Sequence, residues 1–415
     1  MASMHLLKML KTSEIKETKM RVRFILSHPI QYFSPLFREL SKESDLDFEV
    51  WYCSDESVNE NKDIGFGTTL KWDIPLLEGY NYRFFSNQAR RPSIHFGFMG
   101  LWNPDLISAI SKEPKNTVII LHGWNYITHL MVLLLSRVYH KKLILRGDNP
   151  DHHDRMMSPG KQWLKKLILL PLLKLPNLVF YAGKRNFLFF RMYGVSESKL
   201  CFSPHSVDNE RFQLSDQEKT HKRNYLRRTY HIPDEAIVII SPAKYIPKKR
   251  LQDIIEAVGH LNNPHLYLML AGEGPSRDFL QNKAKDTAPG KVIFTGFINQ
   301  SEMPDHYAMA DILCMASGLG ETWGLGVNEG MNSGLPVILS DLCGCAEDLV
   351  EPGVNGYIFP TGNVMVLADY IRQLSEDSDL RTKMGAESKR IIQKYGIHET
   401  LRGMLNGIKC LTRNE

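Results

Sequence analysis

Short apolar runs that alternate with amphipathic stretches constrain the fold of this chain more than any other feature of its sequence. Runs typical of β-strands occur at 21–27, 47–53, 117–121, 142–145 and 178–181, and again at 236–241, 266–270, 292–295, 312–315, 336–339 and 357–359. In most of the intervening stretches, the apolar residues are spaced as on one face of a helix. Apolar strands connected by helices are typical of parallel sheets covered on both faces. The sequence therefore predicts an α/β protein with two doubly wound, Rossmann-like domains.

A charge-rich interval at 213–233 separates the two series and marks the predicted domain boundary. A chain of 415 residues is long enough for two or three domains with cores of their own. We expect a flexible leader over 1–20, a first domain over 21–215, a second domain over 216–395 and a final segment over 396–415. In doubly wound sheets, ligands bind at the carboxyl ends of the strands, so we expect them in a central cleft between the domains.

Composition excludes several classes of protein. An apolar fraction of 43% and a charged fraction of 23% are those of a globular protein, not of a disordered or fibrous one. The net charge of +5 suits an anionic ligand or a membrane surface as well as a nucleic acid, and no aromatic-basic module supports nucleic-acid binding. The longest apolar windows, 126–135 and 167–180, are too short to span a bilayer.

The six cysteines are scattered and do not form a disulfide framework. A reducing compartment follows, so we expect a cytoplasmic protein. Cys343 and Cys345 form the one close pair; a redox pair, half a metal site or two buried thiols are the alternatives for it.

The segment after the run at 312–315 is the most informative part of the chain. Gly324 and Gly326 allow the backbone to approach a ligand closely, and the first amides of the helix predicted near 325–333 form an anion site. Glu321 precedes this helix and Glu329 lies within it, where each could accept hydrogen bonds from sugar hydroxyls. Alternatively, Glu321 caps the helix and Glu329 lies on a solvated face.

A basic loop follows the first strand of the second domain and contains Lys244, Lys248, Lys249 and Arg250. Clustered cations repel one another unless solvent or an anion neutralises them, and a diphosphate is a suitable counter-ion. An exposed, solvated loop is the alternative. The glycine-containing loop at 271–275 lacks the full G-x-G-x-x-G spacing and does not indicate a dinucleotide site.

Together these motifs resemble the family 4 retaining glycosyltransferases of GT-B fold, over most of the chain. Two glutamates separated by seven residues, here Glu321 and Glu329, are the hallmark of that family, and a Gly-Leu-Pro-Val sequence follows them. The resemblance implies that Glu329 binds the ribose hydroxyls of a nucleotide-sugar and that Glu321 contacts the donor sugar. It also implies that amides near Trp323, Gly324 and Leu325 meet that sugar or its phosphates.

The diphosphate and nucleobase positions of the family can be located in the same way. The Gly-Arg-Leu segment that grips the diphosphate in the family is Ala-Lys-Tyr here, so Lys244 replaces the arginine, and Lys249 follows. Lysine keeps the charge but lacks the bidentate geometry of a guanidinium. Phe297 and Ile298 match the strand end where backbone groups bind the nucleobase.

The first domain resembles the family less closely. His122, at the end of a predicted strand, matches the cleft histidine that hydrogen-bonds the donor sugar; a satisfied loop histidine is the alternative. The segment Arg146-Gly147-Asp148-Asn149 ends the next strand and could contact the acceptor or the donor phosphate. The segments 28–36 and 65–80 are similar to those of a subset of bacterial members. In this fold, a final helix such as 396–415 often packs back on the first domain.

A cluster of Asp148, Asp151, His152, His153 and Asp154 could bind a metal, but adjacent histidines point in different directions and no regular spacing organises the set. We therefore expect a solvated loop there. The lysines of the basic loop can neutralise a diphosphate in place of a cation, so we expect no cofactor and a metal-independent reaction.

The resemblance implies a retaining glycosyltransferase that moves a sugar from a nucleotide-diphosphate-sugar to a hydroxyl acceptor in polysaccharide or glycolipid biosynthesis. Its catalytic candidates are Glu321, His122 and Lys249. Alternatives are a nucleotide-sugar epimerase or a sugar phosphorylase of the same fold, and a catalytically silent nucleotide-sugar-binding protein.

Residues 161–170 combine three lysines with apolar side chains and could lie on an anionic membrane surface, which would favour a lipid-linked acceptor. The alternative is a helix whose apolar face packs on the sheet of the first domain.

Overall fold

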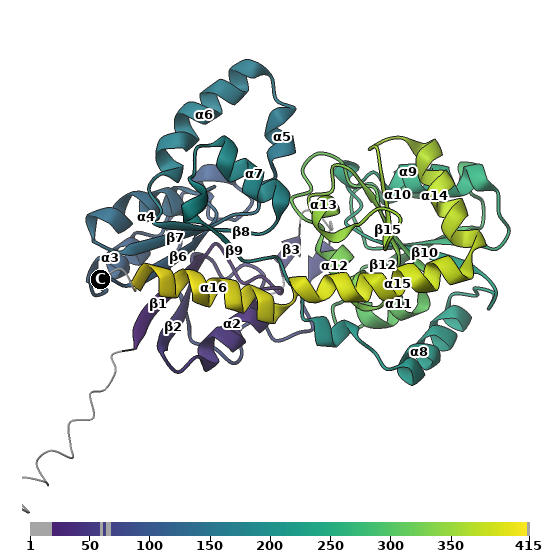
Figure 1. Ribbon diagram of the computed structural model, residues 1–415, viewed down its shortest axis with the longest axis horizontal. Helices are drawn as coiled ribbons and strands as arrows, with labels where there is room; N and C mark the ends of the chain where they lie inside the picture. Colours follow the sequence, from purple (N-terminus) through teal and green to yellow (C-terminus); the bar gives the residue numbers. More distant parts are fainter. Residues whose placement is uncertain (1–18, 59–60, 64–67, 413–415) are drawn as a thin grey trace, which may run out of the picture.

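The computed structural model describes residues 19–58, 61–63 and 68–412, and shows two lobes side by side, each built around a parallel sheet (Figure 1). The expected leader lies outside the described residues except for its last two, and Met20 already begins the first strand. The predicted architecture of two doubly wound α/β domains is confirmed.

The first sheet has seven parallel strands in the order β5-β2-β1-β6-β7-β8-β9. They are β1 (Met20–Leu26), β2 (Leu46–Tyr52), β5 (Tyr82–Phe84), β6 (Val118–His122), β7 (Lys142–Arg146), β8 (Leu178–Tyr181) and β9 (Leu200–Phe202). A separate antiparallel pair consists of β3 (Asn61–Asp63) and β4 (Thr68–Leu70). The strand order reverses between β1 and β6, which makes the carboxyl ends of these strands a topological switch point.

The second sheet has six parallel strands in the order β12-β11-β10-β13-β14-β15. They are β10 (Ile237–Pro242), β11 (Leu266–Ala271), β12 (Val292–Gly296), β13 (Ile312–Met315), β14 (Val337–Ser340) and β15 (Gly356–Phe359). Its switch point lies between β10 and β13. The basic loop follows β10, and the segment with Glu321 follows β13, so the two predicted donor loops leave adjacent strands at the same edge.

Each sheet is buried on both faces, as its apolar strands predict. Along β1, Val22, Phe24 and Leu26 join one cluster of buried apolar side chains, and Ile25 joins another on the opposite face. This alternation is the two-residue period of a strand. Two further clusters cover the faces of the second sheet in the same way.

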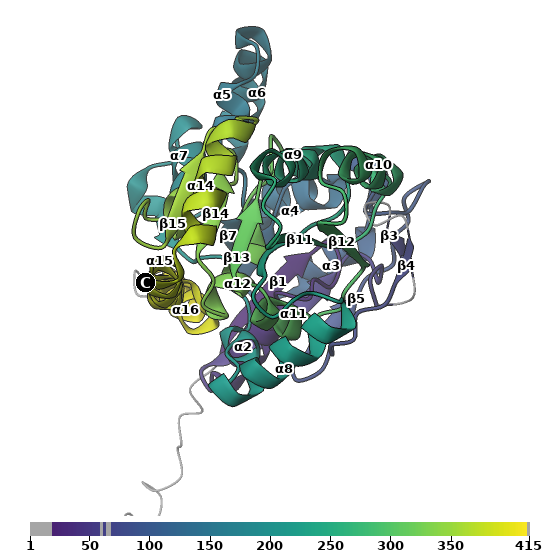
Figure 2. The same ribbon diagram turned by 90° about the vertical axis from the view of Figure 1, so that its right-hand side faces the viewer.

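Helices cover both sheets (Figure 2). Those of the first domain are α2 (Ser34–Lys42), α3 (Pro104–Lys112), α4 (Ile127–Val138), α5 (Asp151–Arg155), α6 (Pro159–Leu173) and α7 (Lys184–Met192). Those of the second are α8 (Asp216–Thr229), α9 (Leu251–Leu261), α10 (Arg277–Thr287), α11 (Met303–Met309), α12 (Leu325–Asn332), α13 (Ala346–Leu349), α14 (Val364–Glu376) and α15 (Ser378–Ile392). Within the described residues, no helix is both long and apolar enough to cross a bilayer.

The charge-rich interval folds largely into α8, which packs against α11. Ser215 begins the helix through a capping box with Glu218. Arg223 and Arg227 donate to the carboxylate of Asp311 at 2.7 and 2.8 Å. The charges that set this interval apart in the sequence therefore anchor α8 to the second domain.

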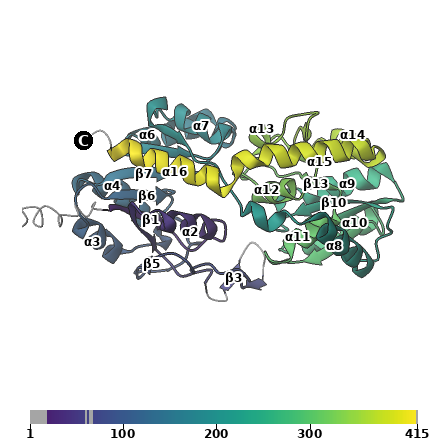
Figure 3. The same cartoon turned by 60° about the horizontal axis from the view of Figure 1, so that its bottom comes forward.

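The final helix, α16 (Ile397–Thr412), returns to the first domain after α15 has run along the second (Figure 3). It contacts α2, β8 and β9, and its Met404 and Ile408 are buried in the core of the first domain. The chain therefore crosses between the domains twice, which ties their relative position to the packing of one amphipathic helix.

Candidate active site

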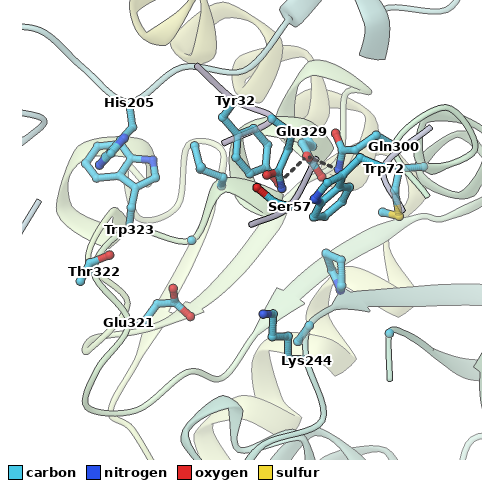
Figure 4. Close-up of a pocket in the computed structure, with 18 of the residues that line it drawn as sticks. Tyr32, Ser57, Trp72, His205, Lys244, Gln300, Glu321, Thr322, Trp323 and Glu329 are labelled. Carbon is cyan, nitrogen blue, oxygen red and sulfur yellow. Dashed lines mark hydrogen bonds between the residues drawn. The ribbon is translucent and has the colours of Figure 1, made fainter. Parts of the chain in front are cut away.

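A cavity of about 650 Å³ lies between the two domains at the carboxyl ends of their strands (Figure 4). The loops after β1, β10 and β13 contribute to its lining. The structure brings to this one cavity the residues of the second domain that the sequence assigns to donor binding: Lys244, Lys249, Phe297, Ile298, Glu321, Trp323, Gly324, Leu325 and Glu329.

Glu329 lies on α12, lines the cavity and is only 2% exposed. Its carboxylate accepts hydrogen bonds from the hydroxyls of Tyr307 (2.7 Å) and Tyr32 (3.1 Å) and from the amide of Gln300 (3.5 Å). Burial raises the pKa of this carboxyl, and the three donors oppose that effect. The burial contradicts the alternative that Glu329 lies on a solvated face.

Glu321 forms an ion pair with Lys249, and both residues line the cavity. Ser317 donates a second hydrogen bond to the carboxylate at 3.0 Å. Burial alone would raise the pKa of Glu321, but the charges of Lys249 and Lys248 and these hydrogen bonds outweigh it and lower the pKa. Glu321 is therefore held ionised, and Lys249 is largely buried rather than part of a solvated loop.

The loops that carry these two residues are joined through their backbones. Lys248 donates its ammonium to the carbonyl of Gly320 (3.1 Å), and its own carbonyl accepts the amide of Gly318 (2.7 Å). Gly324 then begins α12 with a φ of +103°, and a Cβ there would lie 2.9 Å from the sulfur of Met315. Only glycine fits this position, which brings the start of α12 against the cavity.

Cys343 and Cys345 lie behind this loop. Both are buried and free, with their sulfurs 3.7 Å apart, and Cys343 contacts the carbonyl of Trp323 at 3.3 Å. The structure therefore favours the buried-thiol interpretation of this pair.

The first domain closes the other side of the cavity. Thr322 donates to the carboxylate of Asp148 (3.1 Å), and the ring of Trp323 lies 5.4 Å from that of His205. At the far end, Trp72 lies edge-on to Phe297, with 5.9 Å between ring centroids. The predicted nucleobase position is therefore bordered by aromatic rings from both domains.

His122 does not belong to the described lining of the cavity. It ends β6, with its ring 5.0 Å from that of Phe33. Burial and the nearby Arg146 lower its pKa, so its imidazole is neutral. Its Nδ1 is buried, with no hydrogen-bond partner among the described residues. A contact between His122 and a donor sugar stays a prediction.

Arg146 is buried as well. Its guanidinium lies over Phe33, 5.0 Å from the ring centroid, and donates to the carbonyl of Pro204 at 3.3 Å. Burial lowers its pKa to about 10. Arg146 is not among the described residues that line the cavity, whereas Asp148 of the same segment is, and a phosphate or acceptor contact of this segment stays a prediction.

The expected solvated loop at 148–154 is wrong, because most of this segment forms the buried helix α5. Asp151 pairs with Arg155 and Arg185, and Asp154 accepts hydrogen bonds from Lys165 and Tyr193. The carboxylates of α5 are thus neutralised by Arg155 of the same helix and by partners from later segments of the chain. In the described part of the chain, no group of three or more His, Cys, Asp or Glu side chains is arranged to hold a metal ion.

Sequence reasoning assigned no role to four residues that line the cavity, namely Tyr32, Trp72, His205 and Gln300, or to Tyr307, which donates to Glu329. Tyr32 and Trp72 occur in first-domain segments that resemble bacterial family members, which was a signal that these segments serve the site. Tyr307 lies within α11 among other buried residues, where nothing in the sequence separates it from the core.

Parts of the chain are similar to known glycosyltransferases. Residues 222–391 match the family model for glycosyl transferases group 1. A lipopolysaccharide core biosynthesis glycosyltransferase, LpsE of Rhizobium meliloti, is 30% identical over 175 residues, 42% of this chain and 47% of its own length. A GDP-mannose-dependent alpha-(1-6)-phosphatidylinositol monomannoside mannosyltransferase of Mycobacterium tuberculosis is 26% identical over 237 residues, 55% of this chain and 60% of its own length.

The chain thus spans about half to three-fifths of the length of these relatives. Among solved structures, Alr3699/HepE of Anabaena in complex with UDP superposes with a TM-score of 0.73 at 18% identity, covering 95% of this chain and all of that one. At this level of identity, the likeness defines the fold. The protein has the GT-B architecture that the sequence predicts.

Proposed function

We propose that this protein is a retaining glycosyltransferase that moves a sugar from a nucleotide-diphosphate-sugar to a hydroxyl acceptor. The supporting observation is the convergence of Glu321, Lys249, Lys244 and Glu329 on one interdomain cavity at the switch point of the second sheet. The second domain would bind the donor, and the first domain would present the acceptor. The spacing of Glu321 and Glu329 supports a family 4 enzyme.

The leaving diphosphate would be stabilised by cations and by the start of α12. Negative charge develops on the phosphate as the glycosidic bond stretches, and fixed positive charge in a partly dry cleft stabilises that change. Lys249 and Lys244 line the cavity beside the first turn of α12. These lysines would supply the neutralising charge without a metal ion, so we expect turnover to persist in the presence of a chelator.

The two glutamates would hold the two sugars of the donor. Glu329 accepts hydroxyl hydrogen bonds from Tyr32 and Tyr307, and ribose hydroxyls could replace Tyr32 as donors to the same oxygen. Glu321, ionised and held by Lys249, would contact the hydroxyls of the transferred sugar. His122 would complete the sugar contact after a rearrangement that exposes its Nδ1. We assign no general base among these residues.

The proposal also includes the class of acceptor and the kind of pathway. The relatives named for lipopolysaccharide core and phosphatidylinositol mannoside synthesis support polysaccharide or glycolipid biosynthesis for this chain. Free, mostly buried cysteines suit a reducing, cytoplasmic compartment, with peripheral contact to a membrane.

The test is a thermal-shift panel of nucleotide-sugars followed by product analysis. A ligand that binds only the folded protein raises its melting temperature, so one donor class should stabilise the wild type. With that donor, Glu321→Gln should lose most turnover while remaining folded, and the exposed control Glu351→Gln should retain wild-type rates. Wild-type rates in Glu321→Gln would contradict the proposal. Conversion of the donor without an acceptor would instead indicate an epimerase.

A further inference from the structure

The helix α6 presents an apolar face to solvent. It stands out from the rest of the first domain (Figures 1 and 2). Trp163, Leu164, Leu167 and Ile168 are each 53–64% exposed. Their spacing of i, i+1, i+4 and i+5 puts them on one side of the helix. The sequence alternative, in which the apolar face packs on the sheet, is therefore wrong for these four residues.

The opposite side of α6 attaches the helix to the domain. Leu169 and Leu173 are buried, and Lys165 donates to Asp154 at 2.7 Å. This helix thus has one apolar side that the protein covers and a second that it leaves uncovered. Exposed apolar patches of this kind mark interaction surfaces.

The charges around the exposed apolar side of α6 indicate which kind of partner binds there. Residues 155–196 contain eight Lys and Arg, of which five (Arg155, Lys165, Lys184, Arg185 and Arg191) form ion pairs with carboxylates. On α6 and at its end, Lys161, Lys166 and Lys174 are exposed beside the apolar side chains. An apolar centre with a basic rim is complementary to lipid acyl chains below a layer of anionic headgroups. A second copy of the chain would bring the same lysines together, and their repulsion opposes that pairing.

The position of α6 relates this surface to the cavity. In α5, which precedes α6, the Nε2 of His153 accepts a hydrogen bond from the amide of Gly320 at 3.1 Å. Gly320 is the residue before Glu321. The exposed helix is therefore connected through α5 to the loop that carries the predicted donor contact.

We propose that α6 is a membrane-docking helix, whose apolar face of Trp163, Leu164, Leu167 and Ile168 enters an anionic bilayer interface. The acceptor class that follows is a lipid-linked hydroxyl held in that bilayer, an inference that rests on the proposed function. The docking proposal depends only on the helix α6 and not on the proposed function.

Vesicle flotation of the full chain tests the docking. We expect binding to vesicles of phosphatidylcholine with a one-third share of phosphatidylglycerol, and much weaker binding to phosphatidylcholine alone. Each lysine near an anionic surface contributes roughly fivefold to partitioning, so replacing Lys161, Lys166 and Lys174 by Gln should weaken binding roughly a hundredfold. Trp163→Ser with Leu167→Ser should abolish flotation, and added salt should weaken wild-type binding.

Matched control variants lie on the second domain. Replacing Lys285, Lys383 and Lys394 by Gln changes the net charge equally, and all three are exposed. Phe279→Ser with Tyr225→Ser removes two aromatic side chains that are 58% and 62% exposed. Both controls should float like the wild type.

Several outcomes would overturn the docking proposal. They are a wild type that does not bind the anionic vesicles, controls that lose binding as strongly as the α6 variants, and α6 variants that convert a dimer to a monomer without changing flotation. The proposed function is judged separately by the nucleotide-sugar panel, which the α6 variants should leave unchanged. Vesicle binding without any donor response would refute the transferase and leave the docking helix in place.

Discussion

Replacing Lys249 by Met tests the ion pair between Lys249 and Glu321 in the candidate site. Methionine keeps most of the length and apolar volume of the lysine stem but removes its charge. Glu321 would then remain 8% exposed, with Ser317 as its hydrogen-bond donor and Lys248 as the nearby cation. Burial would then dominate and raise the pKa of Glu321.

The size of the effect follows from two limits. Breaking a buried ion pair by removing one partner costs about 3–5 kcal/mol. The carboxyl can escape this cost by taking up a proton, which at pH 7 costs about 3.7 kcal/mol for a group of ordinary pKa near 4.3. Since Lys248 and Ser317 remain, we expect Lys249→Met to lower the free energy of unfolding by about 3 kcal/mol at pH 7.

Urea unfolding at a series of pH values measures this loss. In the wild type, the lowered pKa of Glu321 contributes stability that is present above its ordinary pKa and is lost as the pH falls through the lowered value. In Lys249→Met, the raised pKa destabilises the folded state at neutral pH, and this cost disappears once the carboxyl is protonated. The difference between the two proteins should therefore shrink as the pH falls from 7 towards 4.

A double variant separates stability from function. Adding Glu321→Gln to Lys249→Met removes the uncompensated charge and should restore most of the lost stability at pH 7. Nucleotide-sugar binding should stay weakened in the double variant, because the diphosphate still lacks Lys249. A stability loss that is independent of pH, or that the second substitution does not relieve, would refute the assigned ion pair.

Three further predictions concern other parts of the cleft. Glu329→Gln should weaken nucleotide binding in calorimetry by roughly 10- to 100-fold, because one charge-assisted hydrogen bond of about 1.5–3 kcal/mol is lost; an unchanged dissociation constant would contradict the ribose contact. Burial raises the pKa of Asp348 to about 6, so its contribution favours folding below pH 4 and is lost between pH 4 and 6, and Asp348→Asn should flatten the stability profile over that interval. Gly344→Ala should lower the melting temperature by several degrees, because its Cβ would lie 1.9 Å from the carbonyl oxygen of Thr322; an unaltered melting temperature would show that the loop can move.

Much of the fold could be predicted from the sequence because its patterns are local. The apolar run at 178–181 coincides with β8, and the helix predicted near 325–333 matches α12 to within one residue. Short elements such as β5 and β9 were missed, since three residues at the edge of a sheet give no periodic signal. The donor-side residues were predictable for a related reason, because they lie in loops that directly follow apolar strands.

The sequence by itself determined two parallel sheets and the loops that bring Lys249, Glu321 and Glu329 to one edge. Only the tertiary structure decided that Tyr32 reaches Glu329 across the cleft, that α5 is buried, and that Trp163 faces solvent. Periodicity along a chain shows which side chains share a face of a helix or strand. Whether another element covers that face depends on contacts between residues far apart in sequence, which form only when both domains are folded and the final helix has returned to the first.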